Sequence, residues 1–133
     1  MIELFLLLAA GHYLADFPLQ GDAIARNKGK VFVESVGFHA LTAHAAIHAL
    51  VAAGVAMVLG YDWLWAFLVV GATHWLIDFG KSWERWPDSW RITDGARWPG
   101  NPDARGLYGI NVDQALHMAV PVGLAALLTG GLT

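Results

Sequence analysis

The chain has 133 residues, of which 56% are hydrophobic and 14% are charged, and its formal net charge is −3. Soluble domains are about 45–50% apolar and about 25% charged, so this balance excludes both an ordinary soluble domain and intrinsic disorder. The chain contains no cysteine, which excludes disulfide scaffolds and thiolate metal sites, and its charge gives no reason to expect nucleic acid as a partner. The composition predicts a single integral membrane domain over residues 1–133.

Four stretches approach the length that crosses a membrane, for which a helix needs about 20 mostly apolar residues. In chain order they cover residues 2–17, 36–59, 63–81 and 110–128. The first stretch lacks the basic start and the cleavage site of a secretory signal, so we interpret it as a retained span. The sequence therefore predicts an all-α fold, a four-helix transmembrane bundle with up-down topology.

The connectors predict the orientation of this bundle. Residues 60–62 form a tight link, whereas residues 18–35 and 82–109 are long and polar, and alternating spans put both long connectors on one side. All eight basic residues lie at or within these long connectors: Arg26, Lys28, Lys30, Lys81, Arg85, Arg91, Arg97 and Arg105. The positive-inside rule then makes the two long connectors cytoplasmic and puts both termini outside. We expect a multi-pass protein of the inner (cytoplasmic) membrane, with Trp83, Trp86 and Trp90 at the inner interface.

Each predicted span carries one pair of polar side chains four residues apart, a spacing that puts both on one helical face. The pairs lie late in the first and third spans and early in the second and fourth, so an up-down bundle brings them to similar depth near the cytoplasmic side. The predicted topology rests on the apolar stretches and the basic residues alone. The convergence of these paired side chains at one depth therefore supports that topology independently. The pairs are His12 and Asp16, His44 and His48, His74 and Asp78, and Asp113 and His117.

We expect all eight paired side chains to be ligands of a divalent metal, as one ion or two. A charge at the centre of a membrane helix costs about 2.5–3.5 kcal/mol, and a cation would compensate the carboxylates. Nitrogen and oxygen donors suit zinc, iron, manganese or nickel, of which zinc is the first expectation, with iron or manganese as alternatives. His39 lies off the face of His44 and His48, and we interpret it as structural. The alternative for the four pairs is a polar network that joins the helices without a metal.

Three further polar residues continue the faces that carry the pairs. Gln20 follows Asp16 by four residues, Lys81 follows Asp78 by three, and Gln114 adjoins Asp113. We expect these three side chains to contact a substrate. Lys81 could meet a phosphate group, although a lysine that snorkels to the interface is the commoner arrangement.

The four stretches that carry the pairs resemble domain-of-unknown-function family 3307, a bacterial and phage family of small membrane proteins. The resemblance follows the chain in order and covers nearly all of it, and Asn27 and Lys28 resemble the family's polar stretch after the first motif. The family implies no established activity, but its pattern is similar to that of predicted membrane-bound metal-dependent hydrolases. The stretches are His12-Tyr-Leu-Ala-Asp16-Phe-Pro-Leu-Gln20, His44-Ala-Ala-Ile-His48, His74-Trp-Leu-Ile-Asp78-Phe-Gly-Lys81 and Asp113-Gln114-Ala-Leu-His117.

The first hypothesis for function is a metal-dependent hydrolase that acts on a phosphoester or lipid-like substrate at the cytoplasmic leaflet. In it, Asp78 or Asp113 acts as a general base rather than as a ligand. The alternatives are a non-catalytic metal-binding or ion-handling protein, an accessory subunit, and a b-type haem protein. The almost purely apolar outer halves of the spans disfavour an ion path, and carboxylates beside the histidines disfavour haem. Membrane lipids are the expected partners, and a second copy of the chain or a membrane partner subunit stays open.

Overall fold

The computed structural model describes residues 1–32, 34–82 and 107–130, and the side chains of residues 107–111 are not among those described. The described residues form an all-helical structure. Its elements are α1 (Ile2–Leu14), a π-helical turn η1 (Ala15–Leu19), α2 (Gly21–Asn27), α3 (Ser35–Val58), α4 (Trp63–Lys81) and α5 (Leu107–Leu128). The predicted all-α class is confirmed. The bounds of α4 agree with the predicted span, and those of α3 differ from it by one residue at each end.

Part of the second long connector lies outside the described residues. This applies to the predicted interface belt of Trp83, Trp86 and Trp90, and to the basic residues Arg85, Arg91, Arg97 and Arg105.

Three helical segments are long and apolar enough to cross a membrane, namely Ile2–Leu19, Ser35–Val58 and Trp63–Lys81. The first of them joins α1 to η1 and so extends two residues beyond the predicted span. Within α5, Val112–Leu128 is a shorter apolar helical stretch. These helices are consistent with a membrane protein.

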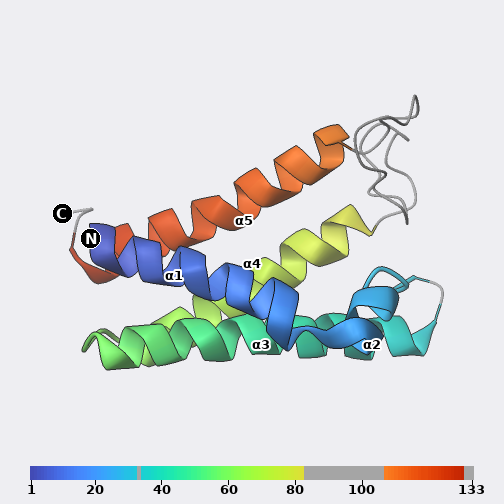
Figure 1. Ribbon diagram of the computed structural model, residues 1–133, viewed down its shortest axis with the longest axis horizontal. Coiled ribbons are helices and arrows are strands. Elements are labelled where there is room, and N and C mark those ends of the chain that lie inside the picture. The colour runs from blue at the N-terminus through green and yellow to red at the C-terminus, as the bar shows by residue number, and fades with distance from the viewer. Residues whose placement is uncertain (33, 83–106, 131–133) are drawn as a thin grey trace.

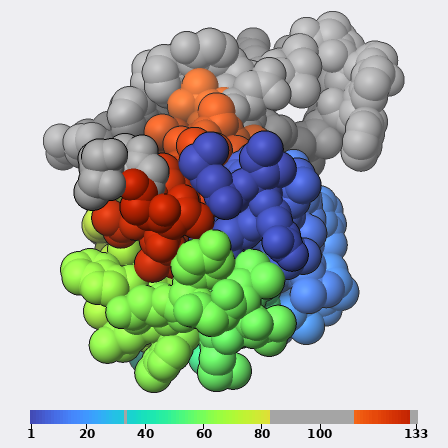
Figure 2. Space-filling view, turned by 90° about the vertical axis from the view of Figure 1, so that its left-hand side faces the viewer, coloured from blue at the N-terminus to red at the C-terminus, as the bar shows by residue number. Residues whose placement is uncertain are grey.

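The four long helices lie side by side, and the chain reverses direction from each of them to the next (Figure 1). α3 packs against α1 and α4, and α5 packs against α4 and α1. Both ends of the described chain lie at the same end of the molecule as the link between α3 and α4. Figure 2 looks onto that end, where the start of α1, this link and the end of α5 meet.

The interior between the long helices is apolar at the end where the termini lie and polar further in. Leu8, Ala52 and Val70 belong to the apolar core. In each of these three helices, the residue four positions from the apolar one, on the side away from the termini, is a buried histidine. These histidines are His12, His48 and His74. His117 of α5 joins them, seven residues before the buried Leu124. The sequence pattern therefore places a polar cluster directly against an apolar core.

Helix α1 does not continue regularly into α2. Pro18 lies inside the π-helical turn and has no N–H to donate to the helix, which accounts for the change in hydrogen bonding there. Such turns occur frequently at functional sites. Gly21 follows with φ of +67°, a conformation that glycine adopts without steric cost, and it redirects the chain into α2. The residues after α2 are thereby brought back towards α3.

The loop after α2 packs tightly on the start of α3. A Cβ atom at Gly37 would clash with the carbonyl group of Lys30 and would lie 2.6 Å from the backbone nitrogen of Val31. A side chain therefore does not fit at Gly37 unless the backbone of the loop moves. This contact holds the loop, which begins at Lys28, beside α3.

Candidate metal centre

The structure brings all eight predicted ligands into one cluster, with contributions from all four long helices and from η1. His12, His44, His48, His74, Asp78, Asp113 and His117 are buried, and the Asp16 side chain is 19% exposed. His39 is exposed and lies outside the cluster, as its position on the helix predicted.

One group of donor atoms comes from Asp16, His44, His48 and His74, and these atoms all lie within 4.8 Å of one another. Asp16 Oδ1 lies 3.4 Å from His44 Nε2 and 3.3 Å from His48 Nε2. His44 Nε2 lies 3.0 Å from His74 Nε2. Donors about 2.0–2.1 Å from a tetrahedral zinc ion are about 3.3 Å apart, so these separations match a single ion.

A second group of donor atoms comes from His74, Asp78 and His117. Asp78 Oδ2 lies 3.6 Å from His74 Nε2, and Asp78 Oδ1 lies 3.5 Å from His117 Nε2. His74 belongs to both groups, but a single Nε2 atom binds a single ion. The cluster therefore offers two arrangements, one ion with four ligands, or two ions that each have two imidazoles and one carboxylate.

His12 and Asp113 lie outside both groups, and each contacts one member. His12 Nε2 lies 3.1 Å from Asp16 Oδ2, which leaves Oδ1 of Asp16 facing the histidines. Asp113 Oδ1 lies 3.2 Å from His117 Nδ1, which leaves Nε2 of His117 facing Asp78. Residues in such positions orient metal ligands and raise their basicity.

The donor atoms fit a cation because several of them have no hydrogen-bond partner. Nε2 of His12, His48 and His117 and Oδ2 of Asp78 are buried without a hydrogen bond, whereas Oδ1 of Asp78 forms an ion pair with Lys81. Buried polar atoms are normally hydrogen-bonded, so this concentration of unsatisfied acceptors calls for another partner. Imidazole and carboxylate donors suit zinc, iron or manganese alike, and the cluster could hold such an ion.

Two lysines also reach the cluster. Lys28 Nζ lies 2.8 Å from His44 Nε2 and 2.7 Å from Gln20 Oε1, which accepts its hydrogen bond. Lys81 pairs with Asp78 Oδ1 and lies 3.2 Å from Asp113 Oδ1. Burial lowers the pKa of Lys28, although the nearby carboxylates of Asp78 and Asp16 oppose this. These ammonium groups compensate part of the negative charge of the buried carboxylates, for which the sequence had predicted a metal ion.

Of the three predicted substrate contacts, Gln20 and Lys81 lie at the cluster. Gln114 is half-buried beside Asp113. Lys28 also lies at the cluster, although the sequence pattern predicted for it only a role in membrane topology. The sequence contains one indication that Lys28 belongs to the site, which is that Asn27 and Lys28 resemble the polar stretch after the family's first motif. The π-helical turn, the reversal at Gly21 and the contact of the loop with α3 bring it to the site.

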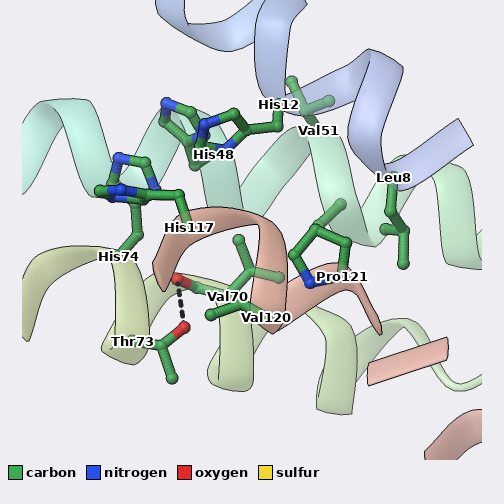
Figure 3. Close-up of a pocket in the computed structure, with 11 residues that line it drawn as sticks. Leu8, His12, His48, Val51, Val70, Thr73, His74, His117, Val120 and Pro121 are labelled. Atoms are coloured by element: carbon green, nitrogen blue, oxygen red, sulfur yellow. Dashed lines mark hydrogen bonds between the residues drawn. The ribbon is translucent and has the colours of Figure 1, made fainter. Parts of the chain in front are cut away.

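A cavity adjoins the histidines on the side of the apolar core (Figure 3). His12, His48, His74 and His117 line one side, and the remaining wall is almost entirely apolar. Thr73 is the remaining polar residue of the wall, and its hydroxyl donates to the Val69 carbonyl oxygen, 2.6 Å away. The space is large enough for a water molecule to reach the imidazoles. The other wall residues are Leu8, Val51, Ala52, Val70, Val120 and Pro121.

Comparison with known proteins identifies a family over almost the whole chain. The model of a family described as "Protein of unknown function (DUF3307)" matches residues 4–130. No curated protein and no solved structure matches the chain. The four stretches that carry the paired side chains all lie within the matched range.

Proposed function

The chain belongs to the DUF3307 family of proteins of unknown function, and from its site we propose a membrane-embedded metal-dependent hydrolase. Its substrate is a phosphoester or lipid-like molecule at the cytoplasmic leaflet. Zinc is the first candidate for the metal, with iron or manganese as alternatives. Such an ion would lower the pKa of a water molecule and polarise a phosphoryl oxygen.

The observation that carries this proposal is that the donor atoms form two groups, which share His74. With His74 assigned to the second group, Asp16, His44 and His48 form one set of three ligands, and Asp78, His74 and His117 form the other. Catalytic zinc sites typically have three protein ligands and one position for water, and paired ions are common in phosphoester hydrolysis. The cavity beside His48, His74 and His117 gives water access to both sets.

The contacts of Asp78 and Asp113, the two carboxylates considered as a general base, indicate their roles. Both oxygens of Asp78 face imidazoles of the cluster, which favours a ligand role over that of a general base. Asp113 lies outside both ligand groups and contacts His117 Nδ1 and Lys81. These contacts favour Asp113 as a positioning residue for His117.

The membrane topology is part of the same proposal. α1 with η1, α3, α4 and α5 are taken as four spans, with both long connectors cytoplasmic and both termini outside. In support, the four helices alternate in direction, and α2, the loop after it and the last turn of α4 all lie away from the end that holds the termini (Figure 1). These segments carry Arg26, Lys28, Lys30 and Lys81. The cluster would then face the cytoplasmic leaflet, where a phospholipid carries its phosphoester.

One observation favours a second candidate function, a non-catalytic metal site. Asp16 Oδ1 lies 3.3–3.4 Å from Nε2 of His44 and of His48, and His44 Nε2 lies 3.0 Å from His74 Nε2. These separations fit a single ion with four protein ligands. Structural zinc sites are closed in this way and leave no position for water. The number of bound ions therefore separates the two candidates.

Elemental analysis of the purified protein tests the proposal directly. We expect two divalent ions per chain in the wild type and loss of at least one in His74→Ala and in Asp78→Ala. Hydrolysis of p-nitrophenyl phosphate and of phosphatidylglycerol in mixed micelles should fall with the metal content. His39→Ala is the matched control, because His39 is exposed and lies outside the cluster.

Each alternative result has its own meaning. Unchanged metal content in both cluster variants would refute the site. One ion per chain with no hydrolysis of either substrate would refute the hydrolase and leave the closed, non-catalytic ion.

A further inference from the structure

Two ammonium groups bracket one carboxylate at the edge of the cluster. Lys28 Nζ lies 3.7 Å from Asp78 Oδ2, and Lys81 pairs with the other oxygen of the same carboxylate. The two lysines come from separate parts of the chain, one from the loop after α2 and the other from the last residue of α4. Two cations are thus concentrated on one side of the candidate metal centre.

This side of the cluster is the one that faces outward. The side chains of Lys28 and Lys81 are 18% and 24% exposed, whereas those of His44 and Asp78 are 0% and 2% exposed. The cavity described above lies on the opposite side, towards the apolar core. Of the described side chains, the two lysines therefore lie nearer the surface than His44 and Asp78, on the side of the cluster away from the cavity.

The charges of the cluster change sign when a metal binds. Among the described residues, the cluster contains the carboxylates of Asp16, Asp78 and Asp113 and the ammonium groups of Lys28 and Lys81. With neutral imidazoles its formal charge is −1. One divalent ion makes it +1 and two make it +3, so the loaded site attracts an anion. Coordination of Asp16 and Asp78 would also withdraw from the lysines the carboxylates that now neutralise them.

We propose that Lys28 and Lys81 form a subsite for the phosphate group of the substrate, next to the metal ligands. This inference rests on the proposed function and narrows its substrate to a molecule with an anionic phosphate. Lysine ammonium groups are common phosphate-binding groups and act as point charges. Gln20, whose Oε1 atom accepts a hydrogen bond from Lys28 Nζ, positions that lysine.

The test measures binding of inorganic phosphate to the metal-loaded protein by calorimetry, beside elemental analysis of the same samples. Loss of a charged hydrogen bond should weaken phosphate binding about tenfold or more in Lys28→Met and in Lys81→Met, while both variants keep their metal. Lys30→Met is the matched control. Lys30 follows in the same loop, is half exposed and lies 4.0 Å from Glu34, so its loss should leave phosphate binding unchanged.

A second pair of measurements identifies the source of the phosphate group. Glycerol 3-phosphate represents a soluble ester, and vesicles of phosphatidylglycerol in phosphatidylcholine represent a lipid headgroup. If binding of glycerol 3-phosphate or of the vesicles depends on both lysines, the subsite is supported. The probe that binds more strongly identifies the source of the phosphate group.

Failure of this inference differs from failure of the proposed function. A metal-loaded protein whose phosphate binding is the same in the wild type and both lysine variants would overturn the subsite alone. A wild-type protein without metal would overturn the proposed function, and the subsite with it, because the three carboxylates would still neutralise the lysines.

Discussion

The carboxylate of Asp113 lies 3.2 Å from Nδ1 of His117, one helical turn later, and this contact fixes how His117 presents itself to the cluster. The same nitrogen lies 2.8 Å from the backbone carbonyl oxygen of Asp113, which can only accept a hydrogen bond. Nδ1 therefore carries the proton, and Nε2 of a neutral His117 presents its lone pair towards Asp78. A metal ligand requires this tautomer, and a carboxylate in this position is its usual partner.

Asp113→Ala should lower the affinity for the metal about 10–100-fold, because Nδ1 of His117 would keep the backbone carbonyl oxygen of residue 113 but lose the nearby carboxylate that raises the basicity of the ring. Asp113→Asn should have a smaller effect, since its side-chain oxygen still places a partial negative charge beside Nδ1. Competition with a chelator of known affinity measures both variants. An alanine variant that binds the metal as tightly as the wild type would contradict the supporting role of Asp113.

Gly37→Ala should destabilise the protein by about 1–3 kcal/mol, the usual effect of overpacking a tight contact. The new Cβ atom would meet the backbone of Lys30 and Val31, which cannot rotate away as a flexible side chain can. Thermal unfolding in detergent measures the effect. Gly54→Ala in the same helix is the control, because its Cβ atom would have no neighbour within 4 Å, and this change should stabilise α3 by about 0.5–1 kcal/mol.

Removal of the metal with a chelator should lower the midpoint of thermal unfolding. An ion that binds only the folded state contributes about 2.7 kcal/mol when its free concentration is 100 times Kd, and this contribution disappears on chelation. Added zinc should restore the midpoint. In His74→Ala the chelator should have a much smaller effect, and an equal shift in this variant would show that the stabilising ion binds elsewhere.

The purified protein should show no haem absorption in the visible spectrum. The imidazole rings of His48 and His74 are stacked with their centroids 3.6 Å apart, and the ring of His12 lies 4.7 Å from that of His48. A porphyrin needs free space between two axial histidines, and rings packed on one another leave none at this point of the cluster. A Soret band that disappears in His48→Ala would reinstate the haem hypothesis.

The helices and the faces on which their polar residues lie are properties of the sequence itself. Apolar runs of about the length of a membrane span predicted α3 and α4 to within one residue. The spacing of His44 and His48, and of His74 and Asp78, put each pair on one face, because helical periodicity is a local property that needs no knowledge of neighbouring helices. Convergence of the pairs at one depth followed from the alternation of the spans.

The tertiary structure alone decided which of these side chains share an ion. Distances between helices depend on how their side chains pack against one another, and no periodicity along one helix encodes them. For this reason the sequence offered all eight residues as ligands, with Asp78 or Asp113 as a general base in the hydrolase hypothesis, whereas the structure sets His12 and Asp113 outside both ligand groups. Lys28 belongs to the site for the same reason. It lies sixteen residues from His44 in the chain, and the π-helical turn, the reversal at Gly21 and the contact of its loop with α3 bring its ammonium group within 2.8 Å of that imidazole.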